Sequence, residues 1–134
     1  MPDTFELEIV TPEKMVVRDQ AEEMQIPGKN GYLGILPGHA PLITELAVGE
    51  ITYRVGSVTH SFAVAWGFAE VLPDKVTILA QTCERPEEVD ARRAQEAKRR
   101  AEQRLSSMSP ETDYPRALDA VQRAETRLQV AEKK

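Results

Sequence analysis

The chain has 134 residues, the length of one ordinary domain or of a small domain with an appendage. Apolar residues make up 41% and aromatic residues 5%, so we expect only part of the chain to build a core. The net charge of −5 argues against a nucleic-acid-binding protein, because such proteins usually carry a basic excess. No stretch approaches the ~18 consecutive apolar residues of a membrane span, and MPDTFELEIV lacks the basic and apolar regions of a secretory signal. With a single cysteine, Cys83, these features predict a soluble cytoplasmic protein or one that docks on a larger assembly.

Glycine and charge divide the chain into two parts. All seven glycines lie at or before Gly67, and glycine is favoured in β turns but avoided inside helices. Residues 1–85 carry 6 basic and 12 acidic side chains, whereas residues 86–134 carry 11 and 10. We therefore expect a β domain over residues 1–85 and a helical region over residues 86–134.

Apolar and polar residues alternate in the first part, as they do in half-buried strands. Phe5, Leu7 and Ile9 show the pattern most clearly. The expected strands cover residues 5–9, 15–17, 24–26, 51–55, 58–64, 68–72 and 76–79, and the turns cover residues 11–14, 27–28, 56–57 and 73–75. Many short strands between Gly and Pro turns predict a β-sandwich or a β-barrel.

The second part has the spacing of helices. Pro86 suits a first helical position, and Glu87 and Glu88 favour the dipole of a first turn. One apolar stripe consists of Ala94, Ala97, Ala101, Leu105 and Met108. After a break at residues 106–110, Thr112 or Asp113 can cap a second helix. Its stripe consists of Tyr114, Ala117, Val121, Ala124, Leu128 and Ala131, so a short connection between two amphipathic helices predicts an antiparallel hairpin.

The predicted hairpin is weakly held. Its stripes are mostly alanine, and a buried CH₂ group contributes only about 0.8 kcal/mol. Isolated helices of about 20 residues are marginal in water. We therefore expect the helices, each roughly 30 Å long at ~1.5 Å per residue, to leave the β domain and open when a partner offers a better surface.

No motif predicts an active site. His39 follows a Pro-Gly turn and His60 lies in a predicted strand, and neither has Cys, Asp or Glu at metal-ligand spacing. We interpret both as structural or interface histidines, and Cys83 as a small buried residue at the domain junction. The phosphate-loop, dinucleotide-binding and serine-elbow motifs are absent from the sequence.

Two arginine pairs form the second candidate site. Arg93 and Arg100 are seven residues apart on the first predicted helix, and Arg123 and Arg127 are four apart on the second. In an antiparallel hairpin the pairs can approach each other, and arginine suits bidentate phosphate contact. The alternative is a solvated helix face that pairs with acids on the same helices: Glu96, Glu102, Asp119 and Glu125. Interleaved acids also argue against nucleic-acid binding by the run at residues 98–100.

Residues 31–42 are rich in glycine, proline and apolar side chains. The simplest interpretation is a tightly turned β connection, and such an apolar loop can also serve as a docking surface. Its core, LGILPGHAPL, resembles the signature of the epsilon subunits of F-type ATP synthases, and residues 73–80 also resemble that family. The resemblance covers essentially the whole chain. It implies an α+β fold, with a β-sandwich of about ten strands followed by an antiparallel two-helix hairpin.

The resemblance also implies a role. Members of the family are non-catalytic subunits of the central stalk of a proton- or sodium-driven ATP synthase, on the cytoplasmic face of the bacterial plasma membrane. Their partners are the gamma subunit, the membrane c-ring and, when the helices extend and inhibit ATP hydrolysis, the catalytic alpha/beta head. Two alternatives remain open from the sequence: a purely structural adaptor between stalk and ring, and an independent nucleotide sensor.

Some bacterial members bind ATP on the compact hairpin through the pattern Ile/Leu-Asp-x-x-Arg-Ala, which matches residues 89–94 here except for Val89. The resemblance therefore implies ATP as a regulatory ligand, with Mg²⁺ as an accompanying ion left open. The implied ATP-binding residues are Glu84, Asp90, Arg93, Ala94, Arg100, Arg123 and Arg127. In the 31–42 segment, Tyr32 stands where some relatives carry an acid, and we expect Tyr32 and His39 at a partner interface.

Overall fold

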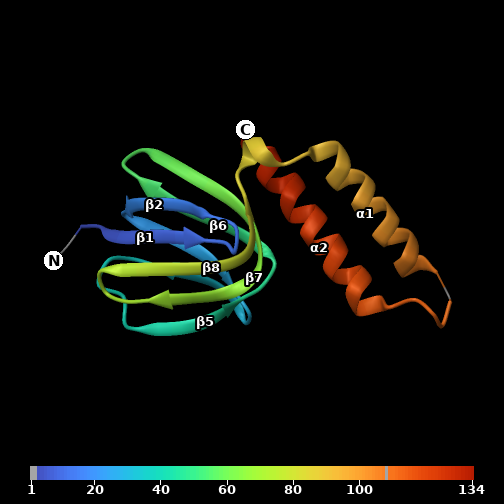
Figure 1. Cartoon of the computed structure of the whole chain (residues 1–134), viewed down its shortest axis with the longest axis horizontal. Coiled ribbons are helices and arrows are strands. Elements are labelled where there is room, and N and C mark those ends of the chain that lie inside the picture. Colours follow the sequence, from blue (N-terminus) through green and yellow to red (C-terminus); the bar gives the residue numbers. More distant parts are fainter. Residues whose placement is uncertain (1–2, 108) are drawn as a thin grey trace.

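The computed structural model describes residues 3–107 and 109–134, so Met108 of the predicted first stripe lies outside the described residues. Figure 1 shows a β-sandwich beside a helical hairpin, with the C-terminus at the seam between them. The predicted order of a β region followed by two helices is confirmed.

The described residues form eight strands rather than about ten. They are β1 (Phe5–Val10), β2 (Met15–Ala21), β3 (Glu23–Gly28), β4 (Gly31–Ile35), β5 (Leu42–Leu46), β6 (Gly49–Val55), β7 (Val58–Val71) and β8 (Lys75–Glu84). Their hydrogen-bonded order is β2-β1-β8-β7-β5-β3-β4, and β6 pairs with β3 and β7. All pairs are antiparallel except β1 with β8.

Strand β7 spans two segments that the sequence predicted as separate strands. Its first half pairs with β6 and its second half with β5, because the chain bends at Trp66 (φ 54°) and Gly67 (φ 135°) without losing its register to β8. A Cβ atom at Gly67 would lie 1.9 Å from the carbonyl oxygen of Leu79, so only glycine fits this bend. One long strand therefore serves both layers of the sandwich.

The segment over residues 31–42 is only partly a loop. Gly31–Ile35 forms β4, which pairs with β3 from Gly28↔Gly31 to Met24↔Ile35, and only residues 36–41 connect strands. Extended pairing places Ile35 in the core, where its side chain is 1% exposed. The gain from burying Ile35 explains why this segment is a strand.

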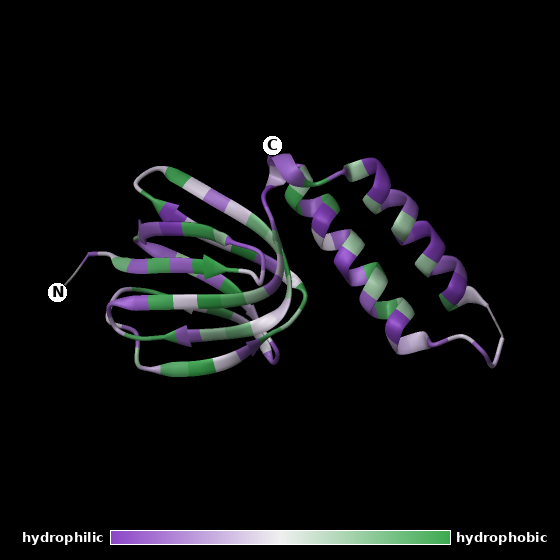
Figure 2. Cartoon of the chain, in the orientation of Figure 1, coloured by the Kyte–Doolittle hydropathy of each residue, from purple (hydrophilic) through white to green (hydrophobic). Residues whose placement is uncertain are grey.

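The core lies between the two layers. The alternating residues predicted to face inward are buried there, including Phe5, Leu7 and Ile9 of β1 and Ile51 and Tyr53 of β6. Figure 2 shows the same alternation as green and purple segments along the strands, whereas purple predominates on the first helix of the hairpin.

The first helix begins later than the sequence predicted. Pro86–Glu88 forms a short 3₁₀ turn, and helix α1 (Ala91–Ser106) begins after Asp90, whose carboxylate accepts a hydrogen bond from the Arg93 amide at 3.0 Å. Between them Val89 is extended and 2% exposed, packed on Ala63. The burial of Val89 thus separates the turn from the helix.

Helix α2 (Tyr114–Ala131) is capped by Asp113, one of the two predicted caps, which accepts from the Arg116 amide at 3.1 Å. The stripe residues buried most completely are alanines: Ala94 and Ala101 of α1, and Ala117 and Ala124 of α2. The hairpin is therefore close-packed but buries little apolar surface. Among the helices of residues 3–107 and 109–134, none is long and apolar enough to cross a membrane.

Candidate functional site at the seam between sandwich and hairpin

The hairpin meets the sandwich through the C-terminal end of α2. Val130 is completely buried against Ala63 of β7 and Val89 of the linker, and Ala131 packs beside them. Small side chains such as Ala63 and Ala65 on the outer face of β7 allow the helix to approach the sheet. The apolar contact between the two parts is therefore small.

An ion pair crosses the seam. Nε of Arg127 on α2 donates to Oε1 of Glu84, the last residue of β8, at 2.6 Å. The side chains of Arg127 and Glu84 are 41% and 28% exposed, so water screens the pair in part. The structure thus brings together two of the residues implied as ATP ligands.

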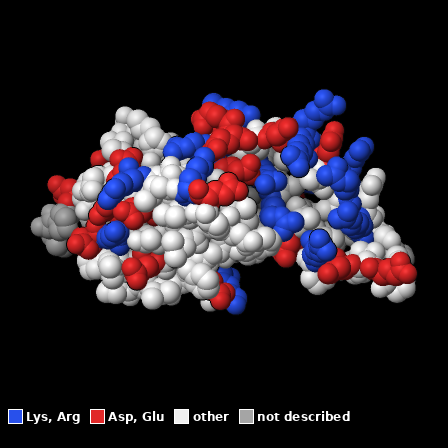
Figure 3. Space-filling view, in the orientation of Figure 1, with Lys and Arg blue, Asp and Glu red and all other residues white. Residues whose placement is uncertain are grey.

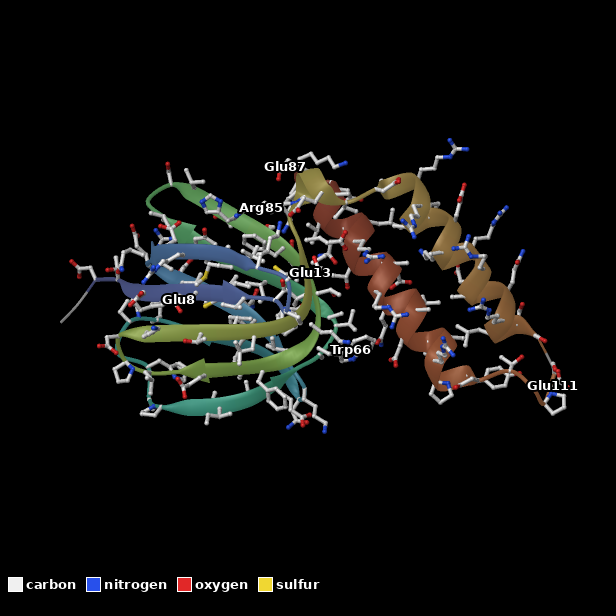
Figure 4. The ribbon with its side chains drawn as sticks, in the orientation of Figure 1. Glu8, Glu13, Trp66, Arg85, Glu87 and Glu111 are labelled. Atoms are coloured by element: carbon white, nitrogen blue, oxygen red, sulfur yellow. The ribbon has the colours of Figure 1, made fainter. Side chains whose placement is uncertain are left out.

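A third contact joins α2 to the bend of β7. The guanidinium of Arg123 lies 5.0 Å from the centroid of the Trp66 ring, within cation–π distance. Figure 4 shows Trp66 at the edge of the sandwich that faces α2. Trp66 was missed by the sequence reasoning because only the bend in β7 directs its ring toward the helix.

The other two arginines lie on the same side of the hairpin. Three of the implied arginines precede a buried stripe alanine by one position, which is about 100° around an α-helix. They are Arg93 before Ala94, Arg100 before Ala101, and Arg123 before Ala124. Because the stripes of antiparallel helices face each other, these positions share one flank of the hairpin, which we call the arginine flank. On α2 its members Arg123 and Arg127 contact the sandwich. Figure 3 shows Lys and Arg side chains gathered over the hairpin and the seam.

Asp90 and Ala94 have roles within the helix. The Asp90 carboxylate caps α1 by accepting a hydrogen bond from the backbone amide of Arg93. Ala94 is 2% exposed between the two helices. Both residues therefore fix the start of α1 and its distance from α2.

The arginine flank is an open surface. The hollow at the seam lined by Glu84, Arg123 and Arg127 holds only about 10 Å³, whereas a small-molecule pocket usually holds ~300 Å³ or more. Within residues 3–107 and 109–134, no carboxylate lies within ion-pair distance of Arg93, Arg100 or Arg123. The flank thus carries the positive charge that phosphate groups require, and the hollow beside Glu84, Arg123 and Arg127 is too small to hold adenosine.

Of the two lysines after the end of α2, Lys133 reaches the sandwich and Lys134 reaches the linker. Nζ of Lys133 lies 2.5 Å from Oε2 of Glu50 on β6, and Nζ of Lys134 donates to the Val89 carbonyl at 3.0 Å. The sequence reasoning missed these contacts. The sequence features that could have indicated these contacts are Lys133 and Lys134 after the second apolar stripe and the acidic Glu50 directly before the alternating residues of β6.

The two predicted interface residues lie in different places. The Tyr32 hydroxyl accepts a hydrogen bond from the Glu50 amide at 3.0 Å, so Tyr32 belongs to the outer face near the seam although its ring is 53% exposed. His39 lies in the 36–41 turn, where the Gly38 amide donates to the Pro73 carbonyl at 2.7 Å. This tip turn (residues 36–41) lies at the end of the sandwich away from the helices (Figure 1).

A second surface lies on the outer face of β5, β7, β8 and β1. Ile43, Phe68 and Leu79 are 72%, 52% and 54% exposed. Phe68 is directly opposite Leu79, and Ile43 is diagonal to Phe68 across the β5–β7 pair. We call these three residues the apolar strip.

The candidates for chemistry have structural roles. Burial raises the pKa of the Cys83 thiol to about 12, so it remains a thiol near neutral pH. The His60 ring stacks on Tyr53 with centroids 4.7 Å apart. In the part of the chain that the structure describes, no three His, Cys, Asp or Glu side chains cluster as metal ligands.

Sequence comparison finds two matching family models that together cover almost the whole chain. Residues 4–86 match the ATP synthase delta/epsilon chain β-sandwich domain, and residues 87–132 match the long α-helix domain of the same chain. The chain is 73% identical over 111 residues to the ATP synthase epsilon chain of Koribacter versatilis, covering 83% of this chain and 78% of that one. It is 48% identical over 134 residues to that of Solibacter usitatus, covering both chains completely.

Solved structures share the fold at low sequence identity. A chain of the Euglena gracilis mitochondrial ATP synthase structure matches with a TM-score of 0.85 at 21% identity, covering 98% of this chain and 83% of that one. A chain in the central stalk and c-ring of the Tetrahymena thermophila enzyme matches with a TM-score of 0.58 at 15% identity, covering 96% and 94%.

Proposed function

Because the chain belongs to the ATP synthase delta/epsilon chain family, we propose that it is a non-catalytic central-stalk subunit of a proton-translocating F-type ATP synthase. It helps to couple ion flow through a membrane ring to ATP synthesis in a separate catalytic head. Its place is peripheral, on the cytoplasmic face of a bacterial plasma membrane. Residues 1–85 act as the stalk-binding part and residues 86–134 as the regulatory part.

The apolar strip carries this proposal. Side chains as large as Ile43, Phe68 and Leu79, gathered on one sheet face and more than half exposed, indicate a protein-binding surface. The strip suits the long gamma subunit of the stalk. The tip turn, with Leu36 59% exposed beside His39, suits contact with the c-ring at the opposite end from the helices.

Co-purification with a tagged gamma subunit tests the docking face. Phe68→Ser and Leu79→Ser should each reduce recovery of the chain at least about tenfold, because both remove apolar surface from the centre of the strip. Leu118→Ser is the matched control, since Leu118 is equally exposed, at 52%, but lies on α2. Recovery that does not change in the strip variants contradicts this docking face, and a chain that never co-purifies with gamma favours the independent nucleotide sensor.

The hairpin supplies regulation in this proposal. In the compact state Arg93, Arg100, Arg123 and Arg127 hold the phosphates of ATP, while Glu84 lies beside them and Asp90 and Ala94 fix the first turn of α1. Charge-assisted hydrogen bonds contribute about 1.5–3 kcal/mol each. ATP thereby favours the compact state by mass action, and low ATP releases the helices, which extend into the alpha/beta head and inhibit hydrolysis.

Calorimetry of the full chain with ATP, with and without Mg²⁺, tests the regulatory ligand. Arg93→Ala and Arg127→Ala should lower the affinity about tenfold or more, because each removes a charged contact to phosphate. Arg99→Ala is the control, since Arg99 is exposed and lies about 200° around α1 from the buried Ala101. No heat with the unaltered chain, or unchanged affinity in the two variants, contradicts the nucleotide site.

A structural adaptor without nucleotide is the second candidate, and a specific observation favours it. Arg127 already pairs with Glu84, and Arg123 already contacts Trp66, so protein groups satisfy two of the four arginines. Calorimetry without heat, together with normal recovery on gamma, would identify the adaptor.

A further inference from the structure

The two lysines that follow α2 make contacts that the proposed function does not use. We propose that Lys133 and Glu50 form a C-terminal latch that holds the hairpin on the sandwich through protein groups alone, and that Lys134 supports it by binding the Val89 carbonyl of the linker. The latch itself is a property of this chain, and only its regulatory consequence rests on the proposed function.

Glu50 is the residue that makes the latch strong. Its side chain is only 10% exposed on the outer face of β6, opposite Ala63 of β7. A carboxylate with so little access to water needs a cation, and Nζ of Lys133 supplies one at 2.5 Å. When the hairpin leaves, Glu50 regains water, but when Lys133 alone is removed the docked carboxylate stays buried and unpaired.

The backbone around Glu50 is held in place from the other side. Its amide donates to the Tyr32 hydroxyl at 3.0 Å, and the preceding residue, Gly49, is packed so closely that a Cβ atom there would lie 2.6 Å from Pro27. The acceptor for Lys133 is therefore fixed before the helix docks.

The position of the latch separates it from the arginines. Lys133 lies six residues beyond Arg127, or roughly 9 Å along a helix. Cations at this end also complement the negative end of the helix dipole. Because the apolar contact consists mainly of Val130 with Ala63 and Val89, these polar contacts decide how firmly the hairpin docks.

Acrylamide quenching of Trp66 fluorescence in the full chain tests the latch. Trp66 is the only tryptophan, and it is 37% exposed beneath Arg123 while the hairpin is docked. Lys133→Ala and Glu50→Gln should each increase the undocked fraction about tenfold, because each breaks a pair with a buried member. Glu132→Gln is the matched control, since it changes the charge of the neighbouring residue and makes no ion pair in the described chain.

The double variant provides the decisive comparison. If Lys133 and Glu50 act as one contact, combining the two substitutions should add little to the larger single effect. Quenching that is unchanged in both single variants, or equal to that of Glu132→Gln, overturns the latch. Each quenching measurement is repeated with ATP. If the variants lose docking but ATP changes the quenching of no chain, the latch is supported and the nucleotide site is contradicted.

Discussion

The guanidinium of Arg123 lies 5.0 Å from the centre of the Trp66 ring, at the point where β7 bends toward α2. The contact joins a helix that the sequence predicts to be detachable to the sheet region that positions it. A partly exposed cation–π pair contributes about 0.5–1 kcal/mol. It is therefore one of several weak contacts that hold the hairpin in place.

Replacing Arg123 by alanine should increase the undocked fraction, measured by acrylamide quenching of Trp66, about two- to fivefold, because the loss of one cation–π contact shifts docking only modestly. Fluorescence of the full chain measures this change. Arg116→Ala should have no effect, since Arg116 is exposed at the start of α2, two turns before Arg123. An equal effect of both substitutions would show that net charge, rather than the ring contact, controls docking.

The Glu84–Arg127 pair should couple less strongly than the Lys133–Glu50 pair. Both members of the first pair are more than a quarter exposed, and such pairs contribute about 0.2–1 kcal/mol. A double-mutant cycle with Glu84→Gln and Arg127→Ala, read by Trp66 quenching, measures the coupling. Raising the salt concentration should weaken it further. If the Glu84–Arg127 coupling is larger than that of Lys133–Glu50, the expectation that the more buried pair couples more strongly is wrong.

Gly67→Ala should unfold or strongly destabilise the sandwich, by about 3 kcal/mol or more. The residue has a φ of 135°, and an added Cβ atom would lie 1.9 Å from a backbone oxygen of the neighbouring strand. Urea denaturation followed by circular dichroism measures the loss. Gly34→Ala is the control, because a Cβ atom there meets nothing within 4 Å and the backbone is not left-handed. Similar losses for both would mean that the bend at Gly67 relaxes easily.

Local sequence patterns were sufficient to predict most of the strands and helices. The alternation of Phe5, Leu7 and Ile9 gave β1, and the alanine spacing gave both helices, because each pattern depends only on neighbours in the chain. The prediction that separate strands lie on either side of Gly67 was wrong, because glycine can let a strand bend and continue as well as end. The start of α1 was placed too early at Pro86 because the burial of Val89 against Ala63 is a long-range effect.

The seam was harder to predict than the elements. The arginines were found by their spacing, and the structure places Arg123 and Arg127 on the sandwich as an antiparallel hairpin allows. Glu50 and Lys133 are 83 residues apart, so no local pattern relates them. Val130 lies outside the predicted stripe of α2, and an apolar residue off the stripe was the signal that this helix contacts a second surface.

Alkaline pH should destabilise the fold through two groups that are wholly or partly buried, Tyr53 and Cys83. Burial raises the pKa of Cys83 to about 12 from an ordinary value of 9.0. Burial also raises the pKa of Tyr53 to about 12 from 10.0, and the hydrogen bond that its hydroxyl donates to Asp19 at 3.0 Å adds to the effect. In the unfolded chain both groups lose their protons at the ordinary values, so above about pH 9 the unfolded state binds fewer protons than the folded state.

The free energy of unfolding should therefore be fully retained below about pH 9 and decrease as the pH rises toward 12. Urea midpoints measured from about pH 8 to about pH 11 test this expectation. Cys83→Ala should flatten the decrease because it removes one of the two titrating groups, although the smaller side chain lowers stability at every pH. Tyr53→Phe should flatten it in the same way. If the decrease remains as steep in both variants as in the unaltered chain, other groups cause the alkaline loss, and Cys83 and Tyr53 do not control it.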